Sequence, residues 1–398
     1  MIEHNPHNVA GHLRDHLATH DKPLVFFFGA GTSAAIKVVS NDDGPEKPLI
    51  PAIAALTEIC KQAVEALGAP YKTSWEILCS ECDQLGIPQN VENILSRIRA
   101  KINAMGVEDT SCGLSRDDLH AAELEIAKTI VREASPNEDL IPPDCPHDVF
   151  SRWIARTSRQ SPIEVFTTNY DILIERSLEK ARVPVFDGFI GSHKPFFAPE
   201  IVEDSKLMPP PEWVRVWKLH GSINWSILDS QGTSQIVRGG RGDPQLILPS
   251  QLKYVESRKE PYLALIDRLS KSLRRDGTLL VSVGFSFGDQ HLNNIIFDAL
   301  DSNPLTHLIC LSYGSLESCS ELKEHAKKHK NIMIIAGDGA VVAGQAGKWG
   351  RSDSTTVFTA FDEKDQEDRG SGEMLLGDFD VFAKFLSEMD PSIAISDE

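Results

Sequence analysis

The stretch that decides the fold lies near the N-terminus and reads Pro23-Leu24-Val25-Phe26-Phe27-Phe28-Gly29-Ala30-Gly31-Thr32-Ser33-Ala34. Its first six residues are apolar without alternation, which is typical of a parallel strand buried on both faces. The Gly-x-Gly-x-x-Ala spacing then places glycines where a backbone can approach a pyrophosphate at a helix start. We expect a central strand followed by a dinucleotide-binding turn, with a plain tight turn as the alternative.

Similar apolar runs recur along the chain and alternate with helical patterns. The expected strands are 163–166, 214–219, 245–248, 278–283, 307–311 and 332–335. The expected helices that follow several of them are 171–182, 289–300 and 317–329. This alternation predicts an α/β fold with a doubly wound, mostly parallel sheet, in which ligands bind outside the carboxyl ends of the strands.

The remaining segments predict additions to one domain that spans residues 1–398. Between 51 and 159 the apolar residues take helical spacing, as in Val91, Ile94, Leu95 and Ile98, so we expect a helical insert with loops at 106–118 and 135–148. Residues 186–211 and 337–377 are expected to be long loops. An amphipathic helix at 378–389 completes a C-terminal loop and helix extension over 337–398.

Composition excludes several classes of protein. The chain has 398 residues, 41% of them hydrophobic, and its 58 acidic against 40 basic residues give a formal charge of −18. Such a charge repels phosphate backbones, so we expect no direct nucleic-acid binding. Seven irregularly spaced cysteines do not predict a disulfide framework, and residues 1–20 lack the apolar run of a signal peptide. We expect a cytoplasmic protein that does not enter a membrane.

Polar residues follow three further expected strands. Thr168-Asn169-Tyr170-Asp171 follows the second strand, where the alternative role for these residues is capping the next helix. His220-Gly221-Ser222 follows the third, and a histidine there can act as a base near neutral pH, although a lone histidine can also be structural. The strand at 278–283 leads into Gly284-Phe285-Ser286-Phe287-Gly288-Asp289, an acidic helix start.

Four strand ends bearing glycine, serine, asparagine and histidine in this order resemble the sirtuin-like, Rossmann-like domains over residues 24–311. The likeness is nearest to the bacterial sirtuin-like NADases of anti-phage defence, which share Thr168-Asn169-Tyr170-Asp171 and the Gly284–His291 pattern Gly-Phe-Ser-Phe-x-Asp-x-His. Leu376-Gly377-Asp378-Phe379 also resembles the end of those proteins. The resemblance implies that NAD is the substrate, cleaved to nicotinamide and to linear or cyclised ADP-ribose.

The resemblance also implies a role for each residue. Asn169 and His220 would be catalytic and face the nicotinamide ribose. The other residues would bind NAD: Gly29, Ala30, Gly31, Thr32 and Ser33 at the pyrophosphate, Thr168, Asp171, Gly221 and Ser222 in the pocket, and Gly284, Ser286 and Asp289 on the adenosine side.

Two departures separate the chain from deacylating sirtuins. It has one Cys-x-x-Cys pair, Cys79 and Cys82, where those enzymes carry two for a structural zinc, so no zinc is expected. Residues 36–51 lack the arginine of the family's substrate loop. An NAD-dependent deacylase and a non-catalytic sensor of NAD or ADP-ribose remain as alternatives. By analogy with its relatives, the chain would form a homo-oligomer and work, gated, with a HerA-type ATPase.

Overall fold

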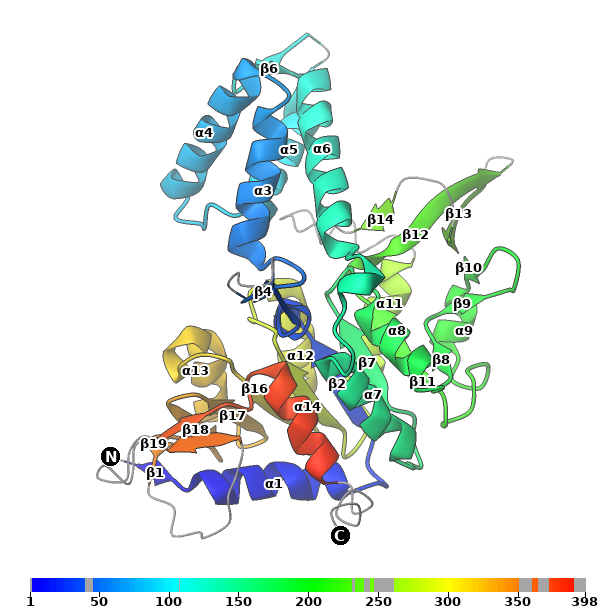
Figure 1. Cartoon of the computed structure of the whole chain (residues 1–398), viewed down its shortest axis with the longest axis vertical. Coiled ribbons are helices and arrows are strands. Elements are labelled where there is room, and N and C mark those ends of the chain that lie inside the picture. Colours follow the sequence, from blue (N-terminus) through cyan, green and yellow to red (C-terminus); the bar gives the residue numbers. More distant parts are fainter. Residues whose placement is uncertain are drawn as a thin grey trace.

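The computed structural model describes residues 2–39, 46–106, 108–230, 233–239, 244–246, 261–350, 360–363 and 372–389. A ten-stranded sheet runs through the molecule in the order β1-β19-β18-β17-β16-β15-β2-β7-β11-β8 (Figure 1). Its strands are β1 (Glu3–His4), β2 (Leu24–Phe28), β7 (Glu164–Thr167), β8 (Val185–Phe186), β11 (Val214–Lys218), β15 (Leu279–Val283), β16 (His307–Leu311), β17 (Ile332–Ala336), β18 (Gly339–Val342) and β19 (Gln345–Trp349). The strands from β17 to β8 are all parallel, which confirms the predicted fold class.

Helices cover both faces of this sheet because successive strand side chains point to opposite sides. Phe27 and Leu280 pack on one side, under α11 (Tyr262–Leu273), α12 (Gln290–Ser302) and α13 (Ser320–Lys328). Phe26 and Val281 pack on the other, under α1 (Pro6–Ala18), α7 (Pro146–Arg156), α8 (Leu173–Lys180) and α14 (Phe379–Glu388). The unbroken apolar runs of the sequence are therefore needed, since both faces of each central strand are buried.

The chain order creates a switch point between β2 and β15. From β2 the chain proceeds to β7 and β11 on one side, and it later returns to β15, β16 and β17 on the other. Doubly wound sheets bind ligands at the carboxyl edge of such a point. The glycine turn at the end of β2 lies at this position.

Four helices stand together apart from the sheet, at the top of Figure 1. They are α3 (Ile53–Glu65), α4 (Ala69–Gln84), α5 (Val91–Ala104) and α6 (Arg116–Ala134). Their apolar faces form a core of their own that includes Trp75, Leu95 and Ile126. The loop expected at 106–118 contains a short hairpin, β5 (Thr110–Ser111) with β6 (Leu114–Ser115). The loop expected at 135–148 contains η1 (Glu138–Leu140) and the start of α7, a helix that packs on the main sheet.

A second sheet is antiparallel and corrects two expectations. Its order is β14-β12-β13-β10-β9, with β9 (Phe189–Ile190), β10 (Phe196–Phe197), β12 (Gly221–Ser230), β13 (Thr233–Arg238) and β14 (Pro244–Leu246). The strand expected at 245–248 in the parallel sheet is β14, paired with β12, as far as residue 246; residues 247–248 lie outside the described residues. The expected loop 186–211 contributes β9, β10 and α9 (Pro199–Glu203), because Phe189 and Phe197 pack on Trp225.

The expected loop at 337–377 also proved wrong where it is described. Strands β18 and β19 join the main sheet as an antiparallel pair, and β20 (Phe361–Glu363) pairs with β21 (Gly372–Met374). Strands β18 and β19 were not predicted because they contain glycines, which in a sequence indicate a loop. A Cβ on Gly339 would lie 2.2 Å from the carbonyl oxygen of Gly347, so this contact requires glycine. A helix does form at the predicted end, as α14. Among helices of the described ranges, none has the length and apolar character needed to cross a membrane.

Candidate functional site

The four strand ends singled out in the sequence meet at one edge of the sheet, because β15, β2, β7 and β11 are consecutive neighbours. Backbone hydrogen bonds join the segments that follow them. The Gly29 N–H donates to the Val283 carbonyl at 3.1 Å, and the Thr168 N–H donates to the Phe28 carbonyl at 3.2 Å. The Leu219 N–H donates to the Thr167 carbonyl at 2.9 Å. Segments distant in the sequence thus form one site.

The glycines of the first turn are required by its contact with the end of β15. A Cβ on Gly29 would lie 2.4 Å from the Gly284 carbonyl oxygen, and one on Gly31 would lie 2.6 Å from the Gly284 Cα. Gly284 itself has φ +66°, a left-handed conformation that favours glycine. Two loops therefore cross without side chains between them. This contact accounts for the glycines whether or not a pyrophosphate also approaches them.

Helix α2 (Ala30–Ala34) begins with two exposed residues, which are followed by two buried ones. Ala30 and Gly31 are exposed, whereas Thr32 and Ser33 are buried. The Thr32 hydroxyl donates to the Gly29 carbonyl at 2.9 Å. Since the hydroxyls of the buried pair bond to Gly29 and Asp171, Ala30 and Gly31 are the residues of this helix that reach the surface.

Asn169 ties this turn to the end of β7. Its Nδ2 lies 3.0 Å from the Gly29 carbonyl oxygen, 3.1 Å from Thr32 Oγ1 and 2.9 Å from Ser33 Oγ. Its backbone N–H donates to the Thr167 hydroxyl at 3.0 Å. The side chain is half-buried. The amide group of Asn169 consequently holds the shape of the glycine turn, a role that its position in the sequence did not indicate.

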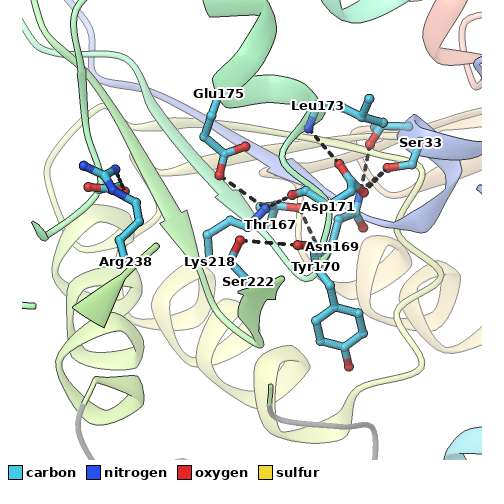
Figure 2. A network of polar contacts seen from close by, with 12 residues as sticks. Ser33, Thr167, Asn169, Tyr170, Asp171, Leu173, Glu175, Lys218, Ser222 and Arg238 are labelled. Atoms are coloured by element: carbon cyan, nitrogen blue, oxygen red, sulfur yellow. Dashed lines mark hydrogen bonds and ion pairs between the residues drawn. The ribbon is translucent and has the colours of Figure 1, made fainter. Parts of the chain in front are cut away.

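Asp171 joins the same network and also contacts the first residue of α8, although Ile172 is the N-cap of that helix (Figure 2). Its Oδ2 accepts a hydrogen bond from the Ser33 hydroxyl at 2.7 Å, and its Oδ1 accepts one from the Leu173 N–H at the start of α8, at 3.1 Å. Asp171 is 4% exposed. The buried Asp171 carboxylate thus connects the glycine turn, through Ser33, to the start of α8.

His220 lies against a carboxylate. Its Nε2 is 3.3 Å from Oδ2 of Asp289, and both side chains are about nine-tenths buried. The Tyr170 ring packs beside it, with ring centroids 6.4 Å apart. A carboxylate at Nε2 favours the neutral form protonated there, which leaves Nδ1 to accept a proton. The resemblance placed Asp289 on the adenosine side, but its carboxylate contacts His220.

The other expected site residues surround these groups. Gly221, with φ +85°, makes the turn from β11 into β12. The Ser222 hydroxyl donates to the Tyr170 carbonyl at 3.3 Å (Figure 2). Thr168 is half-buried at the end of β7, and Ser286 is exposed between Gly284 and Asp289. All of the predicted residues therefore lie on the four connected strand ends.

A buried charged pair behind the site was not predicted. Lys218, 2% exposed, donates to the Asp171 carbonyl and lies 3.3 Å from Oε1 of Glu175 on α8 (Figure 2). Burial raises the pKa of Glu175, while Lys218 acts against that shift. A lysine inside the apolar run Val214–Lys218 was the available signal, since a charge in a doubly buried strand needs a partner.

His147 predicts a dependence of stability on pH. It is 2% exposed at the start of α7, and burial lowers the pKa of His147 to about 4, although Asp171 and Asp148 act against this. An unfolded histidine takes up its proton near pH 6.5. In the folded state His147 is not protonated until the pH falls to about 4. The free energy of unfolding should therefore fall by about 3 kcal/mol as the pH drops from about 6.5 to about 4.

We therefore expect His147→Leu to flatten the dependence of the unfolding free energy on pH between 4.5 and 6.5. Urea unfolding at several pH values measures this. His120→Leu is the control, because the His120 side chain is 51% exposed. An unchanged pH dependence in the His147 variant would contradict the argument.

We also expect no stoichiometric zinc in the purified chain. Cys79 and Cys82 lie on α4, and burial raises the pKa of both thiols, which disfavours the thiolate that zinc binds. The described residues contain no group of three or more His, Cys, Asp or Glu placed to hold a metal. Metal analysis tests this: one zinc per chain, lost together with the fold in Cys79→Ser, would overturn it.

Comparison with known proteins finds a family model that matches part of the chain. Residues 163–335 match the sequence model of the SIR2-like domain, and a search of the curated proteins found no match. The matched segment runs from β7 to β17 and contains Asn169, His220 and Asp289; the glycine turn of β2 lies outside it but contacts it. The SIR2-like family consists generally of NAD-utilising enzymes. Residues 163–335 of the chain are thus similar to the SIR2-like domain.

Proposed function

We propose that this site hydrolyses NAD at the bond between nicotinamide and ribose, releasing nicotinamide and ADP-ribose. One observation carries the proposal. The Asn169 amide and the carboxylate-paired His220 lie at the same edge of the sheet as the glycine turn, at the switch point where doubly wound folds bind nucleotides. The SIR2-like match, which covers β7, β11 and β15 but not β2, supports this placement for Asn169 and His220.

The reaction needs orientation and electrostatics more than a strong nucleophile, because nicotinamide is a good leaving group. Water forms the new bond to the ribose C1′ as the bond to nicotinamide breaks and its electron pair leaves with the ring. The water proton passes to His220. The hydrogen bonds of Asn169 described above use its nitrogens, so we assign its Oδ1 to a ribose hydroxyl or to the attacking water.

The pyrophosphate in this proposal lies against Ala30 and Gly31, the exposed residues of the turn. Ser33, Thr168, Asp171, Gly221 and Ser222 shape the pocket, and Gly284 and Ser286 lie on the adenosine side. A cyclised product replaces ADP-ribose if water is excluded from the closed site.

The proposal includes control of the activity, because unrestrained cleavage would deplete the host cell of NAD. Gating by a HerA-type ATPase within a homo-oligomer, in anti-phage defence, rests on the resemblance of the motifs to sirtuin-like NADases.

Nicotinamide release tests the proposal. The full chain, alone and purified with its genomic neighbour, is incubated with NAD, and the products are separated by chromatography. Release of nicotinamide without an acylated peptide is the expected result. Release that requires an acylated peptide would identify a deacylase, and NAD binding without release would identify a sensor; either result would overturn the proposal.

A further inference from the structure

The segment between β15 and α12 touches both halves of the site. At one end Gly284 contacts the glycine turn, whose Gly31 N–H donates to the Gly284 carbonyl at 2.9 Å. At the other end Asp289 contacts His220. Phe285 and Phe287 anchor the segment on Phe27 and Phe297, and the Phe287 carbonyl accepts a hydrogen bond from the buried Asn293 amide at 2.6 Å. Asp289 is therefore presented from a packed scaffold.

The two oxygens of Asp289 face different partners. Oδ1 accepts hydrogen bonds from the His291 and Leu292 N–H groups, at 3.1 and 3.3 Å, and so caps α12. Oδ2 lies 3.3 Å from Nε2 of His220. The cap restrains the carboxylate, and the carboxylate in turn restrains the imidazole. A cap alone would need only the first oxygen.

We propose that Asp289 is the positioning residue of His220, an inference that rests on the proposed function. Oδ2 keeps the proton of the neutral ring on Nε2, so Nδ1 is the atom that accepts the proton from the attacking water. The resulting imidazolium then lies beside a carboxylate, which stabilises its charge in a site screened from solvent. The proton afterwards leaves His220 for solvent.

Asp289→Asn separates positioning from capping, because asparagine caps helices as well as aspartate does but carries no charge. We expect its urea midpoint to equal that of the wild type, its KM for NAD to stay the same, and its kcat to fall on the order of 10²-fold, within the range of one acid or base group. Asp289→Ala should lose a similar factor in kcat and also unfold at lower urea. Wild-type kcat in Asp289→Asn would overturn the proposal.

A second measurement does not depend on turnover. With ¹³C-labelled histidine, the ring signal of His220 is identified by its absence in His220→Gln, and it is titrated without NAD. In Asp289→Asn, which removes the carboxylate charge, the titration midpoint of His220 should move to lower pH, on the order of one unit. The reason is that a nearby anion favours imidazolium. An unmoved midpoint would overturn the pairing. If the wild type releases no nicotinamide, the proposed function fails, and this titration still decides whether Asp289 controls His220.

Discussion

His220→Ala should lower NAD cleavage by about 10²- to 10⁴-fold, the contribution of a positioned acid or base group. NAD binding should persist, because the contacts that hold the glycine turn come from Asn169 and Gly284 and do not involve this ring. The loss should therefore appear in kcat. Activity should also fall as the pH drops and the His220 ring becomes protonated, because imidazolium cannot accept a proton.

Asn169→Ala should differ from His220→Ala in its NAD binding and in its stability. The variant removes both the oxygen assigned to the ribose and the Nδ2 contacts with Gly29, Thr32 and Ser33. Turnover should be lost as in His220→Ala, but NAD binding should weaken as well. Stability should fall by about 1–3 kcal/mol, since the acceptor oxygens of Gly29, Thr32 and Ser33 lose their amide donor.

Paired measurements of nicotinamide release, NAD binding by calorimetry and urea unfolding distinguish these outcomes. His120→Ala, on the exposed side of α6, is the matched control and should behave as the wild type. If His220 were purely structural, its variant would lose stability before activity. Wild-type turnover in either the His220 or the Asn169 variant would end the proposed mechanism.

Glu164→Gln should cost about 3–5 kcal/mol of unfolding free energy, the effect of breaking a buried ion pair. Glu164 is 1% exposed on β7. Its carboxylate accepts hydrogen bonds from Arg268 at 2.7 and 2.9 Å, from the Trp217 indole at 2.8 Å and from the Ser272 hydroxyl at 3.2 Å. Burial would raise the pKa of Glu164, but Arg268 lowers it below the usual value. The substitution leaves the 4% exposed Arg268 charge without its counterion.

Urea unfolding measures this loss. The double variant Glu164→Met with Arg268→Met should recover only part of it, because the Arg268 charge is gone but the buried Arg215, which also interacts with Glu164, stays in the core. The folded fraction of Glu164→Gln should still turn over NAD, since Glu164 lies at the opposite end of β7 from Asn169. Stability within about 0.5 kcal/mol of the wild type would contradict the burial argument, as this is the range of neutral surface substitutions.

Elements of the fold were predictable where their sequence pattern depends on the element alone and not on its neighbours in the structure. Strands β2, β15 and β16 were predictable because a strand buried on both faces reads as a continuous apolar run. Strand β14 was assigned to the wrong sheet, since a short apolar run carries no information about its neighbour. Strands β18 and β19 were missed because the close approach at Gly339 requires glycine, which in a sequence indicates a loop.

By itself the sequence determined the main strands, the turn after β2 and the residue types at four strand ends, because apolar periodicity and turn chemistry are local properties. Only the tertiary structure decided which polar groups meet. Ser33 and Asp171, 138 residues apart, share a hydrogen bond, and Asp289 contacts His220 rather than only capping its helix. Such pairs depend on the order in which β15, β2, β7 and β11 lie in the sheet, and strand order is a non-local outcome of packing.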